Sequence, residues 1–179
     1  PEATGFSQPS LAGGLDEFFG RITEDSLHNL IAQDLGDSRR LDGPMGTPEE
    51  HADNRTAMAR GPELIGHITA GNLPCPTLMS IIHGVLVGSA QFVKCAEGTG
   101  FIPRLFAHSL YDAHAKLGAC LELATWPGGD HPFEAALFDE ADCIVATGRD
   151  ETLAKIQVRL PRGKRFLGHG HRVSFGYIH

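Results

Sequence analysis

The 179-residue sequence lacks a surplus of basic residues and lacks any long apolar run. Its 15 Lys and Arg residues stand against 22 Asp and Glu residues, which gives a formal net charge of -7. A general nucleic-acid-binding surface is disfavoured, because it would need a basic stripe; a nucleotide cofactor needs only a few residues. No stretch suits a membrane span, and no signal peptide is recognisable. We therefore expect a cytoplasmic protein with no membrane span.

The four cysteines form no C-x-x-C pair. Cys95, Cys120 and Cys143 lie in or beside apolar segments typical of strands, whereas Cys75 lies apart from them. Free cysteine is commonly buried, and disulfides are rare in reducing compartments. We therefore expect reduced structural thiols rather than disulfides or a metal site.

The first sixty residues differ in pattern from the rest. Segments 11–22 and 27–35 carry apolar residues at helical spacing, and Gly and Pro residues then mark a loop over 36–48. From residue 63 onward, short apolar runs alternate with longer amphipathic ones. The sequence therefore predicts an N-terminal helical prefix over 1–60 and a main domain over 61–179.

The main domain reads as strands alternating with helices. We predict strands at 64–69, 90–94, 120–126, 142–147 and 165–167, and helices at 76–88, 101–117, 132–138 and 150–158, with 173–178 left open as strand or helix. In the helix over 101–117 we expect the core-facing side chains to be Leu105, Phe106, Leu110, Tyr111 and Leu117. Short apolar strands bounded by glycine indicate an α/β fold, a three-layer Rossmann-like open parallel sheet with helices on both faces.

Polar residues follow the first two predicted strands. Asn72 lies in the turn after the first strand, and Lys94 and Glu97 follow the second. Open parallel sheets bind ligands outside the carboxyl ends of their strands, so all three should face one cleft. Lys94 could reach a phosphate or a ribose hydroxyl, and Glu97 could accept hydrogen bonds from a ribose. The alternatives are a turn shaped by its Gly, Asn and Pro, and a strand-end lysine in solvent.

Two later segments could serve the same cleft. Thr147 and Gly148 end the fourth strand and could lie beside a pyrophosphate or a nicotinamide, while Asp150 could cap the next helix. His169 and His171 form a His-x-His pair, which invites a metal interpretation. Because no third ligand of obvious spacing lies nearby, apart from His179, we favour a backbone turn and expect no metal.

Five segments together resemble a known family. Their order and spacing are similar to the nucleotide-binding domain of the aldehyde dehydrogenase superfamily, most closely its acyl-CoA reductase branch, which supplies fatty aldehyde in bacterial bioluminescence. The segments are His67-Ile-Thr-Ala-Gly-Asn-Leu-Pro74, Val93-Lys94, Thr125-Trp-Pro-Gly-Gly-Asp130, Asp142-Cys-Ile-Val-Ala-Thr-Gly148 and Gly168-His-Gly-His-Arg-Val-Ser174. No G-x-G-x-x-G motif follows the first strand, as is usual in this superfamily.

The resemblance implies a role for each candidate residue. Asn72 matches the catalytic asparagine whose amide stabilises the oxyanion, and Lys94 matches the lysine that contacts the adenosine ribose. Glu97 lies where many members place a ribose-binding glutamate, which would clash with a 2′-phosphate. This favours NAD over NADP as the cofactor, although the bioluminescence reductases use NADPH. Thr147 and Gly148 match the cofactor-binding segment beside the pyrophosphate and nicotinamide.

The sequence also departs from the family. Members attack the acyl group with a cysteine of a second domain, and none of the four cysteines here matches it; the glutamate base found near Gly168 in most aldehyde dehydrogenases is also missing. The resemblance therefore implies the cofactor-binding part of an acyl-thioester reductase that makes an aldehyde with NAD(P)H, inactive by itself. Alternatives are a noncatalytic nucleotide-binding or interaction module, part of an aldehyde-oxidising dehydrogenase, and a relative acting on acyl phosphates. A homo-oligomer is also open, because superfamily members are usually dimers or tetramers.

Overall fold

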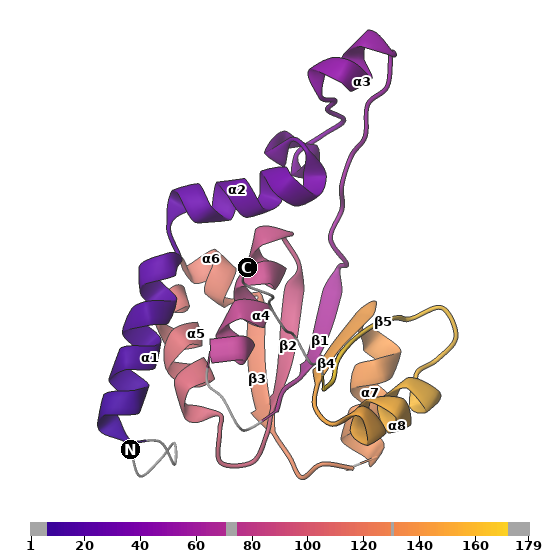
Figure 1. Ribbon diagram of the computed structural model, residues 1–179. Coiled ribbons are helices and arrows are strands. Elements are labelled where there is room, and N and C mark those ends of the chain that lie inside the picture. Colours follow the sequence, from indigo (N-terminus) through magenta and orange to yellow (C-terminus); the bar gives the residue numbers. More distant parts are fainter. Residues whose placement is uncertain (1–6, 71–74, 130, 172–179) are drawn as a thin grey trace, which may run out of the picture. The chain divides into compact units, whose positions relative to one another are not determined.

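A computed structural model describes residues 7–70, 75–129 and 131–171 (Figure 1). The chain divides into two compact units, Pro1–Gly61 and Pro62–His179. None of the helices within the described ranges is long and apolar enough to cross a membrane.

The first unit is helical. It contains α1 (Gln8–Arg21), α2 (Glu24–Leu35), the 3-10 helix η1 (Ser38–Leu41) and α3 (Pro48–Ala52). The predicted helices at 11–22 and 27–35 are confirmed, but both begin earlier than predicted. The side chains of Ser7 and Thr23 cap the N-termini of these helices, and the first turn of each helix is polar. The apolar spacing therefore begins about one turn after the helix does.

The loop after α2 is organised by Arg40. Its guanidinium donates to the carbonyl oxygens of Leu35 at 2.6 Å and Met45 at 3.2 Å, and it pairs with the Glu50 carboxylate. Met45, before α3, and Ala57, after it, form an isolated antiparallel bridge. Helix α3 was not predicted, because five residues are too few for apolar spacing to reveal a helix.

The second unit is built on a parallel sheet. Its strands are β1 (Leu64–Ile68), β2 (Ala90–Cys95), β3 (Leu121–Thr125), β4 (Cys143–Thr147) and β5 (Arg165–His169), in the order β3-β2-β1-β4-β5. All four pairings are parallel. The α/β, Rossmann-like prediction is therefore confirmed. The strand order reverses beside β1, which places a topological switch point between β1 and β4.

Helices cover both faces of this sheet (Figure 1). They are α4 (Cys75–Leu86), α5 (Phe101–Ala113), α6 (Ala115–Gly118), α7 (His131–Glu140) and α8 (Asp150–Arg159). On one face, Ile81 of α4 packs with Val93, Cys95 and Leu121, and α5 adds Phe106 and Leu110. On the other face, α7 and α8 bury Leu137, Phe138, Leu153 and Ile156 against Ile68 and Ile144. Each such side chain contributes roughly 1.5–3 kcal/mol of hydrophobic stabilisation.

The helix predicted over 101–117 is broken. His114 takes an extended conformation, with φ -153° and ψ 92°, and its Nδ1 accepts a hydrogen bond from the Leu117 N–H. The prediction that Phe106 and Leu110 face the core is confirmed. Leu105, Tyr111 and Leu117 were also predicted to face the core, but all three are exposed. Helix α5 buries a narrower stripe of side chains than the sequence suggested, and the break changes the direction of the residues after it.

Candidate functional site

A hollow of about 1290 Å³ lies at the carboxyl edge of the sheet. Because all five strands are parallel, the segments after their carboxyl ends meet at this edge. Small-molecule sites are commonly roughly 300–1,000 Å³, so the hollow suits an extended ligand. Segments at the ends of β1, β3, β4 and β5 contribute to its lining, as does Lys94 within β2. Helices α7 and α8 add Glu134, Thr152, Ala154, Lys155, Ile156, Val158 and Arg159.

Lys94 lines the hollow near the end of β2 and is only 6% exposed. It pairs in register with Ile68 of β1 and Ala124 of β3. Its carbonyl oxygen accepts hydrogen bonds from the Thr69 N–H at 3.1 Å and the Thr69 hydroxyl at 3.3 Å. Among the described residues, no carboxylate lies within ion-pair distance of its ammonium group. A buried cation is costly unless it is paired, so this position suits an anionic or hydroxyl-rich ligand.

Thr147 and Gly148 also line the hollow, at the end of β4. The Gly148 N–H donates to the His169 carbonyl oxygen at 3.1 Å, which extends the β4–β5 ladder past Thr147. That amide is therefore already satisfied within the sheet. The structure brings Lys94, Thr147 and Gly148 to one hollow, but their contacts with a cofactor remain predictions.

Asp150 does not cap α8. The N-cap position belongs to Arg149, whose side chain makes no capping bond, and Asp150 is the first helical residue. Its carboxylate instead accepts the His171 N–H at 2.9 Å. A side chain at position 170 would collide with the Asp150 Oδ1, so Gly170 is what allows this close approach. The segment predicted as a backbone turn instead continues β5 through His169, and Gly170 and His171 follow in irregular conformation, with the His171 N–H bonded to α8. The described residues contain no cluster of three or more potential metal ligands.

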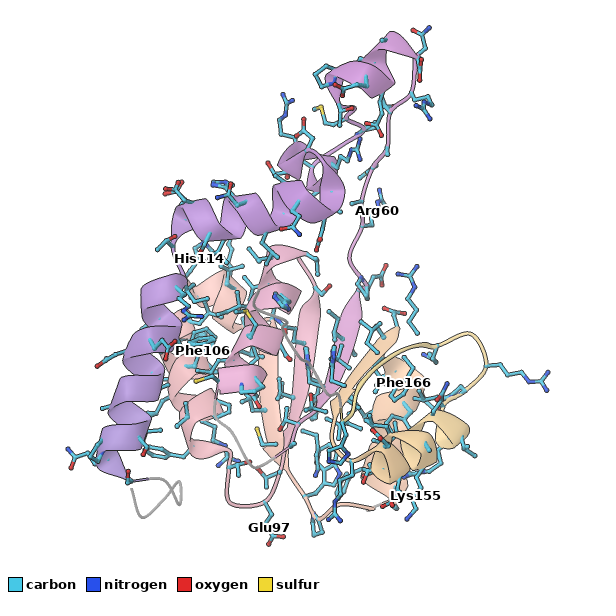
Figure 2. The ribbon with its side chains drawn as sticks, in the orientation of Figure 1. Arg60, Glu97, Phe106, His114, Lys155 and Phe166 are labelled. Atoms are coloured by element: carbon cyan, nitrogen blue, oxygen red, sulfur yellow. The ribbon has the colours of Figure 1, made fainter. Side chains whose placement is uncertain are left out.

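Of the other two predicted site residues, one is not described and one lies outside the lining of the hollow. Asn72 lies outside the described residues. Glu97 is exposed in the turn after β2 and is not among the lining residues; Figure 2 shows its side chain pointing outward from that turn. Its ribose contact remains a prediction that needs a direct test.

Sequence reasoning missed an ion pair in the wall of the hollow. The carboxylate of Glu134, a residue only 6% exposed, pairs with the Arg159 guanidinium and accepts the Gly129 N–H at 3.1 Å. The guanidinium also lies over the Phe138 ring, 5.3 Å from its centroid. No local pattern could reveal a pair whose members are 25 residues apart and belong to successive helices.

The lining is cationic although the chain is acidic. Four basic side chains line the hollow, whereas Glu134 is its one acidic residue among those described. The formal net charge of the whole chain is -7. Clustered charge in a concave, low-dielectric site focuses its field on a ligand of opposite sign. The basic residues are Lys94, Arg149, Lys155 and Arg159.

His67 lies in β1 and is 2% exposed. In the sequence it stands out only as the start of a resembling segment, and its burial was missed. Its Nε2 lies 3.0 Å from the Gln91 Oε1, and the Gln91 Nε2 donates to the Ile81 carbonyl oxygen at 3.0 Å. Burial lowers the pKa of His67 to about 4, and the Gln91 hydrogen bond opposes this shift. His67 is therefore neutral near pH 7 and joins β1, β2 and α4 through polar contacts.

Comparison with known proteins shows which sequences this chain resembles. The chain is 23% identical over 159 residues to a long-chain acyl-protein thioester reductase of Photorhabdus laumondii. It is 22% identical over the same length to proteins of that name from Aliivibrio fischeri and Photorhabdus luminescens. In each case the match covers 87% of this chain and 32% of the relative, so the chain spans about a third of the length of these proteins.

A family model settles the relationship. The model of the acyl-CoA reductase (LuxC) family matches residues 1–179. The resemblance inferred from five short segments is thereby confirmed over the whole chain, including the helical unit that those segments did not reach. This chain belongs to the acyl-CoA reductase (LuxC) family.

Proposed function

We propose that this chain is the cofactor-binding part of an acyl-thioester reductase and holds NAD(P)H at the carboxyl edge of its sheet. The observation that carries the proposal is Lys94, a buried ammonium group that lines a large hollow together with Thr147 and Gly148. The cationic lining fits a polyphosphorylated dinucleotide. The relatives named as long-chain acyl-protein thioester reductases suggest the substrate class, a long-chain acyl thioester.

The proposed chemistry divides between this chain and a part of the enzyme outside it. A cysteine thiolate outside this chain would attack the thioester carbonyl, expel the original thiol and form a thioacyl-cysteine. A reduced nicotinamide held here would supply the hydride, and release of the cysteine thiolate would then give the aldehyde. Asn72 donates its amide N–H to the oxyanion that develops on the acyl oxygen. Lys94 holds the dinucleotide in place, and Thr147 and Gly148 lie beside it.

The choice between NAD and NADP depends on Glu97. The preference for NAD inferred from the sequence requires this carboxylate to reach the ribose, but Glu97 is exposed and outside the lining. The basic residues of the lining favour the ligand with the additional phosphate. We therefore propose that both cofactors bind and that NADPH binds more tightly than NADH.

Equilibrium titration of the purified chain with NADH and NADPH tests this proposal. Lys94→Met keeps the length and apolar character of the side chain but removes its charge, and we expect it to weaken both dinucleotides about tenfold or more. Lys116→Met is the matched control, because Lys116 is exposed on α6 and lies outside the hollow. Unchanged affinity in Lys94→Met would refute the assignment.

The same titration of Glu97→Gln tests whether Glu97 sets the relative affinity for NADH and NADPH. If Glu97 accepts hydrogen bonds from the ribose of NADH, Glu97→Gln weakens NADH and leaves NADPH bound at least as tightly as before. If the ratio of the two affinities does not change, Glu97 has no part in the site.

A noncatalytic nucleotide-binding module is the second candidate. The state of two thiols favours it. Cys95 and Cys143 are buried and lie outside the lining of the hollow, and burial raises the pKa of each thiol. Neither can serve as a ready thiolate nucleophile. A longer protein containing this chain that binds NADPH but reduces no acyl thioester would support the module over the reductase.

A further inference from the structure

We infer that Arg159 contacts a phosphate of the bound dinucleotide and that Glu134 is the residue that positions it. The inference rests on the proposed function, because it assigns a further contact within the same hollow. Its basis is the ion pair between α7 and α8, which the sequence did not reveal and to which the cofactor contacts above assign no role.

The Arg159 guanidinium is held on two sides. One Nη donates to the Glu134 carboxylate, and the carbon between its nitrogens lies 5.3 Å from the Phe138 ring centroid. The side chain is 26% exposed and lines the hollow. A guanidinium carries five N–H donors, and the others have no protein partner in the part of the chain that the structure describes. An oriented cation with unused donors at a cavity wall is suited to bind an oxyanion.

Glu134 connects three parts of the wall. Its side chain is 7% exposed, one oxygen accepts the Gly129 N–H at 3.1 Å, and the other pairs with Arg159. Gly129, Glu134 and Arg159 all line the hollow. The carboxylate therefore fixes the turn after β3 and the last turn of α8 with respect to each other, and it sets the direction of the guanidinium.

The competing interpretation is purely structural. Arg159 could serve only to neutralise a buried carboxylate and tie α8 to α7, with no ligand contact. Removing Arg159 alone cannot separate the two, because it leaves Glu134 buried without a partner, which destabilises the wall and repels an anion. A variant that removes both charges can separate them, since the net charge of the lining then equals that of the wild type.

The experiment compares the wild-type chain with three variants in titrations with NADH and NADPH. Arg159→Met keeps the stem over Phe138, and Glu134→Gln/Arg159→Met also removes the carboxylate charge while keeping an acceptor for the Gly129 N–H. Arg162→Met is the control, because Arg162 is exposed and outside the hollow. Trp126, the single tryptophan, lies two residues before Gly128 of the lining and reports binding through energy transfer to the reduced nicotinamide.

We expect Arg159→Met to lower affinity about tenfold or more, as for loss of a charge-assisted hydrogen bond. The double variant should remain several-fold weaker than wild type, since it still lacks the guanidinium. If it regains wild-type affinity for both dinucleotides, Arg159 has only the structural role and the inference is overturned. A loss confined to NADPH identifies the 2′-phosphate as the partner, whereas equal losses identify the pyrophosphate.

Arg159→Lys covers the case in which the neutral variants do not fold. It keeps the positive charge opposite Glu134 but loses the planar fork, so we expect a loss of about threefold or more with no change in thermal unfolding. Unchanged affinity in this variant would also overturn the inference. Failure of the wild-type chain to bind either dinucleotide would instead refute the proposed function, so the two failures are distinguishable.

Discussion

At the scale of single residues, His67 makes a pH-dependent contribution to stability. Its pKa is lowered from 6.5 to about 4 in the folded chain because burial removes the imidazole from water. The unfolded chain therefore binds a proton at this position between those two values, and the folded chain does not. The stabilising effect is fully present above about pH 6.5 and is lost as the pH falls towards 4.

Urea unfolding at about pH 7 and about pH 5 measures this contribution. We expect the wild type to lose about 2 kcal/mol more unfolding free energy between these pH values than His67→Gln, whose amide does not titrate. The other histidines are common to both proteins and cancel in the comparison. Parallel losses in the two proteins would show that His67 does not titrate as its burial implies.

The cysteines should differ in reactivity with their environment. Burial raises the pKa values of the Cys95 and Cys143 thiols, whereas Cys120 is exposed. Because the thiolate is the reactive form, we expect an alkylating reagent near neutral pH to modify Cys120 about tenfold faster or more than the two buried thiols. Peptide mapping by mass spectrometry over time measures the rates. Comparable rates at all three cysteines would mean that the strands carrying Cys95 and Cys143 open easily.

At the scale of elements, α4 depends on one close approach to β2. A Cβ at Gly84 would overlap the side chain of Gln91, which is held by His67 and the Ile81 carbonyl. We expect Gly84→Ala to lower the unfolding free energy by about 1–3 kcal/mol, because overpacking displaces this buried amide. Chemical denaturation measures the change.

Gly13→Ala is the matched control for that experiment. Gly13 also lies inside a helix, but a Cβ there meets nothing within 4 Å. We expect it to be neutral or to stabilise by up to about 1 kcal/mol, owing to the helix propensity of Ala. If both variants behaved alike, propensity rather than the contact with Gln91 would govern Gly84.

The positions of the strands could be predicted from the sequence, whereas the burial of several side chains could not. All five strands lie within about two residues of their predicted bounds, because short apolar runs between glycines define buried parallel strands. Helix boundaries and faces were less predictable. The break at His114 depends on its side chain accepting a hydrogen bond from the Leu117 N–H, and the burial of His67 depends on a partner 24 residues away.

At the scale of the whole molecule, the sheet topology explains which part of the candidate site the sequence could predict. Parallel strands deliver Lys94, Thr147 and Gly148 to one edge, so the position of strand ends was sufficient to bring them together. Glu134 and Arg159 meet because α7 and α8 pack on the same face, which the sequence pattern does not specify. The charge of the lining is equally beyond the sequence pattern, since a chain of net charge -7 places four basic residues and one acidic residue of its described part around the hollow.

Energy transfer from Trp126 to NADPH in the wild-type chain and in Lys94→Met tests the central claim most directly. The sole tryptophan is buried at the end of β3 beside the turn that lines the hollow, so a dinucleotide bound there lies close to the indole. We predict saturable sensitised emission at one dinucleotide per chain, with affinity about tenfold lower or more in Lys94→Met. Absence of sensitised emission in the wild type, or an identical titration in Lys94→Met, would contradict the assignment of this hollow as the dinucleotide site.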